Sequence, residues 1–395
     1  MKSSDKVKRI SVFAPVGTLD HQTSLLNAIT SFAEAGYRVD VYAVRNRRFA
    51  TPVFHSANVR MRYMPWTFDA EREPRMMVTV MFVAWILAIL WRRHPIIYAG
   101  GIRGLFAAYF YSLFRRTHII NYQMELYLGD KLQSRIAKWF KTLERRGAQR
   151  SEFSIEHSDE RREVLAQDLG IPRERILTIP NAPIGPGNPI QSKFMHNRMG
   201  LDESTRILLC PGTLGEEYRT SVVVRESRTL PPGWHCVVHS PGWRDENDPY
   251  IQGLRELGKG APVSFSLNPV PYSQIDDVLG SARIGIALYT QGSGPNWSTI
   301  GLASGKLSHF MKVGIPVIVA PLPGLTEFVH KHGIGEVLEQ PEQMRELVDK
   351  IEGDWDAYRA RALRCFEEHL SYNRNFKQVL ERTDRWLDPS HGEAG

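Results

Sequence analysis

The chain has 395 residues, which is enough for two domains of about 200 residues each. Its hydrophobic content of 42% and charged content of 24% are ordinary for a soluble globular protein. The chain has three widely spaced cysteines, Cys210, Cys236 and Cys365, and this spacing excludes a CxxC redox or zinc motif. We therefore expect buried thiols in a protein of a reducing compartment.

The net charge of +7 is unevenly distributed, because residues 1–200 carry +13 and the remainder carries −6. A basic first half suggests an anionic partner, either acidic lipid or nucleic acid. The plain alternative is a solvated basic surface that binds nothing. No nucleic-acid recognition motif accompanies the charge, so nucleic acid is the least supported of these partners.

The N-terminal residues 1–9 are charged and do not resemble a secretory signal. The most apolar stretch is Met76–Trp91, whose 16 residues fall short of the roughly 20 that a membrane span needs. A strand-like segment, Ile96–Ala99, follows it closely. We therefore expect a buried or interfacial helix there, in a cytoplasmic protein that contacts the inner membrane face peripherally.

The first half of the chain alternates apolar β-branched runs with helical periodicity, which is typical of βαβ units and a parallel sheet. Its first loop lacks a GxGxxG dinucleotide fingerprint. The predicted strands are Ile10–Pro15, Tyr37–Val44, Ile96–Ala99, His118–Tyr122, Phe153–Ile155 and Ile176–Ile179, and the predicted helices are Thr23–Ala35, Leu105–Phe114, the basic segment Lys131–Arg150 and a segment ending at Leu169.

The alternation stops at Pro180–Pro183 and at the Pro- and Gly-rich segment Ile184–Lys193. We therefore predict a first Rossmann-like domain over residues 1–183 and a linker over 184–200. A second such domain is predicted over 201–370, followed by residues 371–395, a C-terminal helix that packs back on the first domain, and a tail.

In the second half the alternation resumes. Strands are predicted at Arg206–Cys210, Trp234–His239, Val263–Phe265, Ile284–Tyr289 and Val317–Val319, with a helix at Tyr272–Leu279. Asp276 and Asp277 fall in that helical pattern, so we interpret them as solvated acids and not as a DxD metal motif. No HxxxH pair and no Ser/His/Asp arrangement is present, so a metal-free site is expected.

The segment Asn296–Ala320 reads as a polar loop, a helix, a tight turn and a buried strand. Ser304 and Gly305 open the helix, Gly314 ends it, and Pro316 prevents its continuation. The N-terminus of such a helix presents unpaired N–H groups and the positive end of its dipole. With Lys306 adding charge, we predict an anion site, and diphosphate is the obvious anion.

Three stretches resemble glycosyltransferase family 4, a family of retaining GT-B-fold enzymes that use nucleotide sugars. Ile179–Pro183 resembles the family's "iPNap" segment. Leu208–Leu214 and Val237–Gly242 resemble its second-domain strand–loop pairs. Ser304–Leu307 and Gly314–Val317 resemble its "s-x-K-l … G-x-P-v" pattern.

The resemblance implies an α/β GT-B fold: two facing Rossmann-like domains with parallel sheets and a cleft between them. It implies a hexosyl- or other glycosyltransferase that needs no cofactor and no metal. The donor, a UDP-sugar by preference, would bind the second domain, and a glycan or lipid-linked acceptor in polysaccharide or glycoconjugate biosynthesis would bind the first. The implied catalytic residues are Lys306, Arg219 and Glu125, the donor site holds Gly212, Thr213, Ser240, Gly242, Tyr289, Ser304, Gly305, Leu307 and His309, and the acceptor side holds Gly17, Thr18 and His21.

The sequence departs from the family at three positions. The family's E-x7-E glutamates fall on Gly301 and His309, and Met124 stands where a histidine is common, one residue before Glu125. A catalytically impaired GT-B-like binding or scaffold protein is therefore the alternative. A sugar epimerase on the same fold is less favoured, because its chemistry needs clearer acid/base carboxylates.

Overall fold

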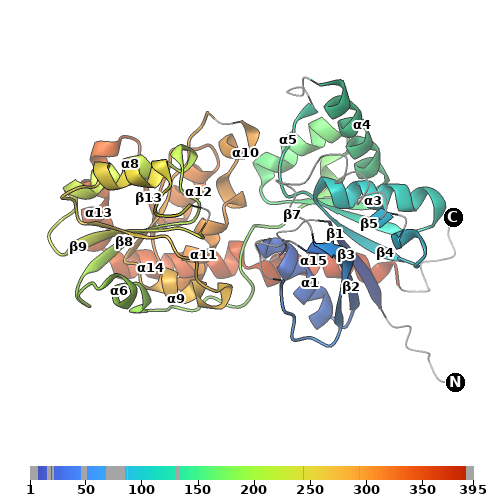
Figure 1. Ribbon diagram of the computed structural model, residues 1–395, viewed down its shortest axis with the longest axis horizontal. Coiled ribbons are helices and arrows are strands. Elements are labelled where there is room, and N and C mark those ends of the chain that lie inside the picture. Colours follow the sequence, from blue (N-terminus) through green and yellow to red (C-terminus); the bar gives the residue numbers. More distant parts are fainter. Residues whose placement is uncertain are drawn as a thin grey trace. The chain divides into compact units, whose positions relative to one another are not determined.

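The computed structural model describes residues 8–387, apart from 16–18, 20–21, 46–50, 68–84, 87, 130–133, 243 and 293. The chain divides into two compact units, one formed by residues 1–179 and 372–395 and the other by residues 180–371. Each unit is built on one sheet whose paired strands run parallel, with helices packed on it (Figure 1). The predicted α/β fold with two parallel sheets is therefore confirmed.

The first unit has a seven-stranded sheet in the order β3-β2-β1-β4-β5-β6-β7. The strand order reverses between β1 and β4, so their carboxyl ends form the switch point where doubly wound folds bind ligands. The strands are β1 (Arg9–Ala14), β2 (Arg38–Arg45), β3 (Val59–Thr67), β4 (Ile96–Gly100), β5 (His118–Tyr122), β6 (Phe153–Glu156) and β7 (Ile176–Thr178), and the helices between them include α1 (Thr23–Glu34), α3 (Gly101–Phe114), α4 (Arg135–Arg150) and α5 (Asp159–Leu169).

A last helix, α15 (Tyr372–Arg385), completes this first unit. Its Phe376 packs edge-to-face on Phe32 of α1, with ring centroids 5.3 Å apart. The Tyr372 hydroxyl donates a hydrogen bond to the backbone oxygen of Ser24 at 3.2 Å. Asp384 pairs with Lys8 at 2.7 Å. The helix thus covers α1 through Phe376 and Tyr372 and pairs with the residue before β1 through Asp384.

The second unit has a six-stranded sheet in the order β10-β9-β8-β11-β12-β13. Its strands are β8 (Arg206–Pro211), β9 (Trp234–His239), β10 (Val263–Ser266), β11 (Ile284–Ala287), β12 (Val317–Val319) and β13 (Gly335–Val337), and its helices are α6 (Phe194–Met199), α7 (Thr220–Glu226), α8 (Pro249–Leu257), α9 (Ile275–Gly280), α10 (Pro295–Ser298), α11 (Gly305–Val313), α12 (Leu325–His332), α13 (Met344–Gly353) and α14 (Trp355–Cys365). All three cysteines are buried free thiols.

Residues 184–200, which the sequence suggested as a linker, pack on the second unit. The backbone N–H of Asn188 donates to the Lys312 oxygen at 2.8 Å, and that of Ser192 donates to the Gly280 oxygen at 3.0 Å. The short helix α6 follows. This segment is therefore ordered by backbone hydrogen bonds to α11 and α9.

The apolar stretch 76–91 lies partly outside the described residues. Of its described part, Trp85 and Ile89 are buried in the core and Trp91 is exposed. Across the residues that are described, no helix combines the length and the apolar character that crossing a membrane requires.

Candidate functional site

The N-terminus of helix α11 forms part of the candidate anion site of the second unit. It begins at Gly305, and Gly314 ends it in the left-handed conformation at φ 74°, as predicted. The Ser304 hydroxyl does not cap the helix, because it hydrogen-bonds with the hydroxyl of Tyr289. Asn181 donates from Nδ2 to the Ala303 oxygen at 3.2 Å and so fixes the chain ahead of the helix. The positive end of the helix is therefore left without a side-chain cap.

The amine of Lys306 lies over two aromatic rings. Its Nζ is 4.6 Å from the ring centroid of Tyr218 and 5.5 Å from that of Tyr289. Within the part of the chain that the structure describes, no carboxylate forms an ion pair with this partly buried lysine. Desolvation lowers its pKa. The ring faces balance the charge through cation–π interaction, while the three N–H donors stay available to an anion.

Gly212 in the loop after β8 makes this position of the lysine possible. Its φ is +103°, and a Cβ there would lie 2.7 Å from Cε of Lys306. The Gly212 N–H donates to the His239 oxygen at the end of β9, at 2.8 Å. The loop after β8, the end of β9 and the start of α11 therefore meet at the carboxyl edge of this sheet.

Other predicted donor residues lie in the loops along the same edge. Thr213 follows Gly212 and is partly buried. In the loop after β9, the Gly242 N–H donates to Oγ of the buried Ser240 at 3.3 Å. Arg244 Nε donates to the Leu214 oxygen at 3.1 Å, which ties this loop to the one after β8.

Arg219 comes directly after Tyr218 and precedes helix α7. Among the described non-glycine residues it alone has a positive φ, at 50°. That conformation is sparsely populated for side chains with a Cβ. Tyr218 also contacts Trp297, with ring centroids 5.0 Å apart. The loop thus brings an aromatic pair to Lys306, and Arg219 is the next residue in the chain.

Leu307 and His309 occupy different faces of α11. Leu307 is fully buried, so its side chain belongs to the core. His309 is partly buried, its Nδ1 has no hydrogen-bond partner among the described residues, and its ring meets Tyr272 edge-on. Burial lowers the pKa of His309 to about 4, so the imidazole is neutral at pH 7.

The interpretation of Asp276 as a solvated acid is wrong. Its carboxylate pairs with Lys312 of α11 at 2.7 Å.

Two groups of predicted residues fall in the first unit. Gly17, Thr18 and His21 lie outside the described residues. Glu125 lies in the loop after β5, where its side chain is exposed. Partial desolvation by the surrounding protein raises its pKa, and the positive charge of Arg161 opposes this shift.

Glu156 and His157 form a buried polar pair at the end of β6 that the sequence did not reveal. Glu156 Oε1 accepts a hydrogen bond from the His157 N–H at 2.8 Å, and Oε2 has no hydrogen-bond partner among the described residues. Burial raises the pKa of Glu156 to about 7 despite Arg161. His157 Nδ1 lies 3.0 Å from the Ile179 oxygen and must donate to it, so Nε2 accepts from the Tyr122 hydroxyl. Burial lowers the pKa of His157 to about 4.

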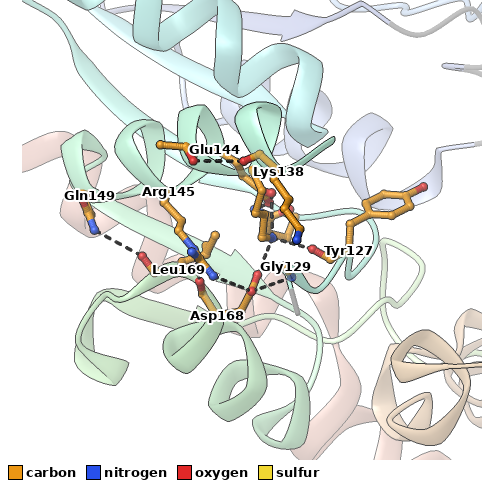
Figure 2. Close-up of polar contacts among 11 residues, drawn as sticks. Tyr127, Gly129, Lys138, Glu144, Arg145, Gln149, Asp168 and Leu169 are labelled. Carbon is orange, nitrogen blue, oxygen red and sulfur yellow. Dashed lines mark hydrogen bonds and ion pairs between the residues drawn. The ribbon is translucent and has the colours of Figure 1, made fainter. Parts of the chain in front are cut away.

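A buried ion cluster holds the loop that carries Glu125. Lys141 of α4 pairs with Glu144 at 2.8 Å and with Asp168 of α5, and its Nζ also donates to the Tyr127 oxygen. Asp168 Oδ1 accepts from the Gly129 N–H at 2.9 Å, and Figure 2 shows this loop held between the two helices. The loop is therefore anchored two and four residues after Glu125.

Within the described ranges, no three His, Cys, Asp or Glu side chains are grouped so that they could hold a metal ion. The predicted set also omits Tyr218, Trp297 and the Lys141 cluster. The sequence offered only weak indications of the two aromatic residues. Tyr218 stands next to Arg219, and Trp297 lies in the polar loop before Ser304.

Comparison with known proteins gives a family match for part of the chain and fold matches for nearly all of it. Residues 21–182 match the family described as "Glycosyl transferase 4-like domain". No curated protein matches this sequence. Similar solved structures are sucrose-phosphate synthase from Thermosynechococcus elongatus (TM-score 0.74, 13% identity, 96% of this chain and 99% of that chain), HepE from Anabaena in complex with UDP and glucose (0.69, 13%, 95% and 99%), and WaaG, a glycosyltransferase involved in lipopolysaccharide biosynthesis (0.65, 14%, 94% and 98%).

Proposed function

We propose that this chain, which has the GT-B fold and resembles glycosyltransferase family 4, transfers a sugar from a nucleotide diphosphate sugar to an acceptor. The observation that carries the proposal is the amine of Lys306, which lies over Tyr218 without a carboxylate partner among the described residues, at the open N-terminus of α11. Negative charge develops on the leaving diphosphate in the transition state. Fixed N–H dipoles and a preorganised cation stabilise that charge.

We propose the following donor contacts. Lys306 and Arg219 supply charge to the diphosphate, and the backbone at Gly305 and Gly212 approaches it closely. His309, one turn along α11, presents a neutral imidazole to the ribose in place of a carboxylate. Because HepE was solved with UDP and glucose, a UDP-sugar is the first donor to test.

The rest of the proposal concerns the stereochemistry and the acceptor. We propose transfer with retention of configuration and without a metal, in which the donor phosphate takes the acceptor proton. Glu125 contacts the acceptor, which is a glycan or a lipid-linked sugar of polysaccharide or glycoconjugate synthesis. The protein would work in the cytoplasm at the surface of an anionic membrane, which suits the +13 charge of residues 1–200.

Thermal-shift measurement against a panel of nucleoside diphosphates and nucleotide sugars tests the donor assignment, with slow donor hydrolysis followed by mass spectrometry. We expect one nucleoside diphosphate family to raise the melting temperature and the matching sugar donor to be hydrolysed. Lys306→Met should abolish both responses. Lys259→Met, at a lysine that is 77% exposed in the same unit, should change neither.

Two outcomes would contradict the proposal. Near-normal hydrolysis by Lys306→Met would remove the lysine from the site. Binding without any turnover of a full donor and acceptor panel would instead favour a binding protein that has lost catalysis.

A further inference from the structure

The outer side of α3 is apolar although it faces water. Arg103 is the only charged residue of this helix. Its inner side, including Leu105, is buried, but at its C-terminal end Leu113 is 53% exposed and Phe114 is 72% exposed. A helix that is apolar around its whole circumference is normally enclosed by protein or lipid. The outer side of α3 therefore needs a cover.

Helix α4 extends this apolar surface. The ring of its Phe140 stacks on Phe106 of α3 with centroids 5.5 Å apart, and the neighbouring Trp139 is 56% exposed. Toward the C-terminal ends, Arg150 of α4 donates from Nε to Ser112 Oγ of α3 at 2.7 Å. The two helices thus lie side by side (Figure 1) and present one surface.

We call this surface the α3–α4 face. It consists of the exposed apolar side chains Leu113, Phe114, Trp139 and Phe140 and the exposed basic side chains Arg103, Arg115, Arg116 and Arg146.

The charge on this face has one sign. Helix α3 contains no acidic residue, and the single acid of α4, Glu144, is buried against Lys141. The arginines therefore meet no exposed carboxylate from either helix. Exposed apolar groups among basic side chains suit a partner that offers both hydrocarbon and negative charge.

We propose that the α3–α4 face docks on an anionic phospholipid bilayer, with its aromatic and aliphatic side chains at the headgroup level and its arginines on lipid phosphates. At 14 residues, α3 is about 21 Å long, which is shorter than the roughly 30 Å hydrocarbon core, so it lies along the surface. A second copy docked through the same face would set arginines against arginines with no acid between them. The inference deepens the membrane part of the proposed function and rests on it.

Flotation of the full chain with vesicles tests the docking. The vesicles are phosphatidylcholine alone or with about one third phosphatidylglycerol, at low and at high salt. We expect binding only to the anionic vesicles and loss of that binding at high salt. Arg115→Gln/Arg116→Gln should reduce the partition about 30-fold. Leu113→Ser/Phe114→Ser should also reduce it strongly.

Matched controls lie in the second unit. Arg345→Gln/Lys259→Gln makes the same change in net charge at exposed positions, and Tyr272→Ser removes an exposed aromatic ring. Both should bind vesicles as the wild type does, and circular dichroism should show all variants folded.

Equal binding to neutral vesicles, unchanged binding of the Arg115/Arg116 variant, or binding to duplex DNA in place of vesicles would overturn the proposal. Donor hydrolysis by the same preparations separates the two ideas. Hydrolysis without vesicle binding would refute the docking alone, and vesicle binding without hydrolysis would refute the transferase alone.

Discussion

The amine of Lys306 lies 4.6 Å from the centre of the Tyr218 ring. The two residues come from different loop–helix segments of the second unit, and no local sequence pattern links them. A lysine that an ion pair holds must give up its partner before it binds phosphate. A lysine that a ring face holds keeps its hydrogen-bond donors free for the ligand. The aromatic ring therefore sets the position of the cation without competing for it.

Replacing this ring should weaken nucleotide binding. Tyr218→Leu removes the face under the amine, and because a cation–π contact contributes about 1 kcal/mol, we expect about a 5-fold higher Kd for UDP. Tyr218→Phe keeps the face and should bind as the wild type does. Isothermal titration calorimetry measures both, and equal affinities of the Leu and Phe variants would contradict the role of the ring.

Gly212→Ala should weaken nucleotide binding in addition to the loss of stability that its backbone conformation causes. At φ +103° the new Cβ would lie 2.7 Å from Lys306 Cε and displace the amine. Gly260→Ala is the matched control, because that glycine also has a positive φ, +74°, and nothing within 4 Å of a Cβ. Both variants should lose about 1 kcal/mol of unfolding free energy. Only Gly212→Ala should lose nucleotide binding, which thermal-shift titration with UDP measures.

The buried carboxyl of Glu156 should make stability depend on pH. Its pKa rises from 4.5 in the unfolded chain to about 7 in the folded one, so the folded state binds more protons between these values. This contribution to stability is present below pH 4.5 and is lost as the pH rises through 7. Glu156→Gln should therefore gain about 2 kcal/mol more unfolding free energy at pH 8 than at pH 5.

Urea denaturation at the two pH values checks this prediction, with Glu256→Gln, at a carboxylate that is 77% exposed, as the control. A gain for Glu156→Gln that is independent of pH would be incompatible with a raised pKa.

His157 changes stability with pH in the opposite direction to Glu156. Its pKa of about 4 lies below that of the unfolded chain, so its contribution to stability is lost as the pH falls from 6.5 to 4.

Removing one member of the Lys141 cluster should lower the unfolding free energy strongly, whereas replacing all three charged members by neutral side chains should lower it much less. Lys141→Met leaves Glu144 buried without a cation and leaves Asp168 with only Arg145, at 3.3 Å, so we expect a loss of about 3–5 kcal/mol of unfolding free energy. Adding Glu144→Gln and Asp168→Asn removes the unpaired charges and should restore most of that loss. Lys259→Met, at an exposed pair, should change stability by less than about 0.5 kcal/mol. Urea unfolding measures all three.

Elements whose pattern is local were predictable from the sequence. The predicted strand Val317–Val319 is β12, and the helix predicted to open at Ser304 and Gly305 and to end at Gly314 is α11. A β-branched run and a pair of helix-end signals are complete within a few residues, so no distant contact is needed to read them.

Features that depend on orientation or on distant partners were not predictable. The basic segment Lys131–Arg150 was correctly assigned as helical over its described part, but charge composition does not show that Lys141 turns inward to two carboxylates. The edge strand β3 was missed, because its alternating arginines and its proline resemble an exposed loop. Leu307 was assigned to the donor site from the family resemblance, and that motif does not show that its side chain packs in the core.

The position of helix α15 at the end of the chain determines the order in which the two units can complete folding during synthesis. The second unit is one continuous segment, residues 180–371, and so it can fold as soon as that segment has left the ribosome. The first unit begins earlier but lacks Phe376 against Phe32, and Asp384 against Lys8, until α15 follows. The segment synthesised first is thus the later one to be completed, and until then the surface of α1 that α15 covers is open to chaperones.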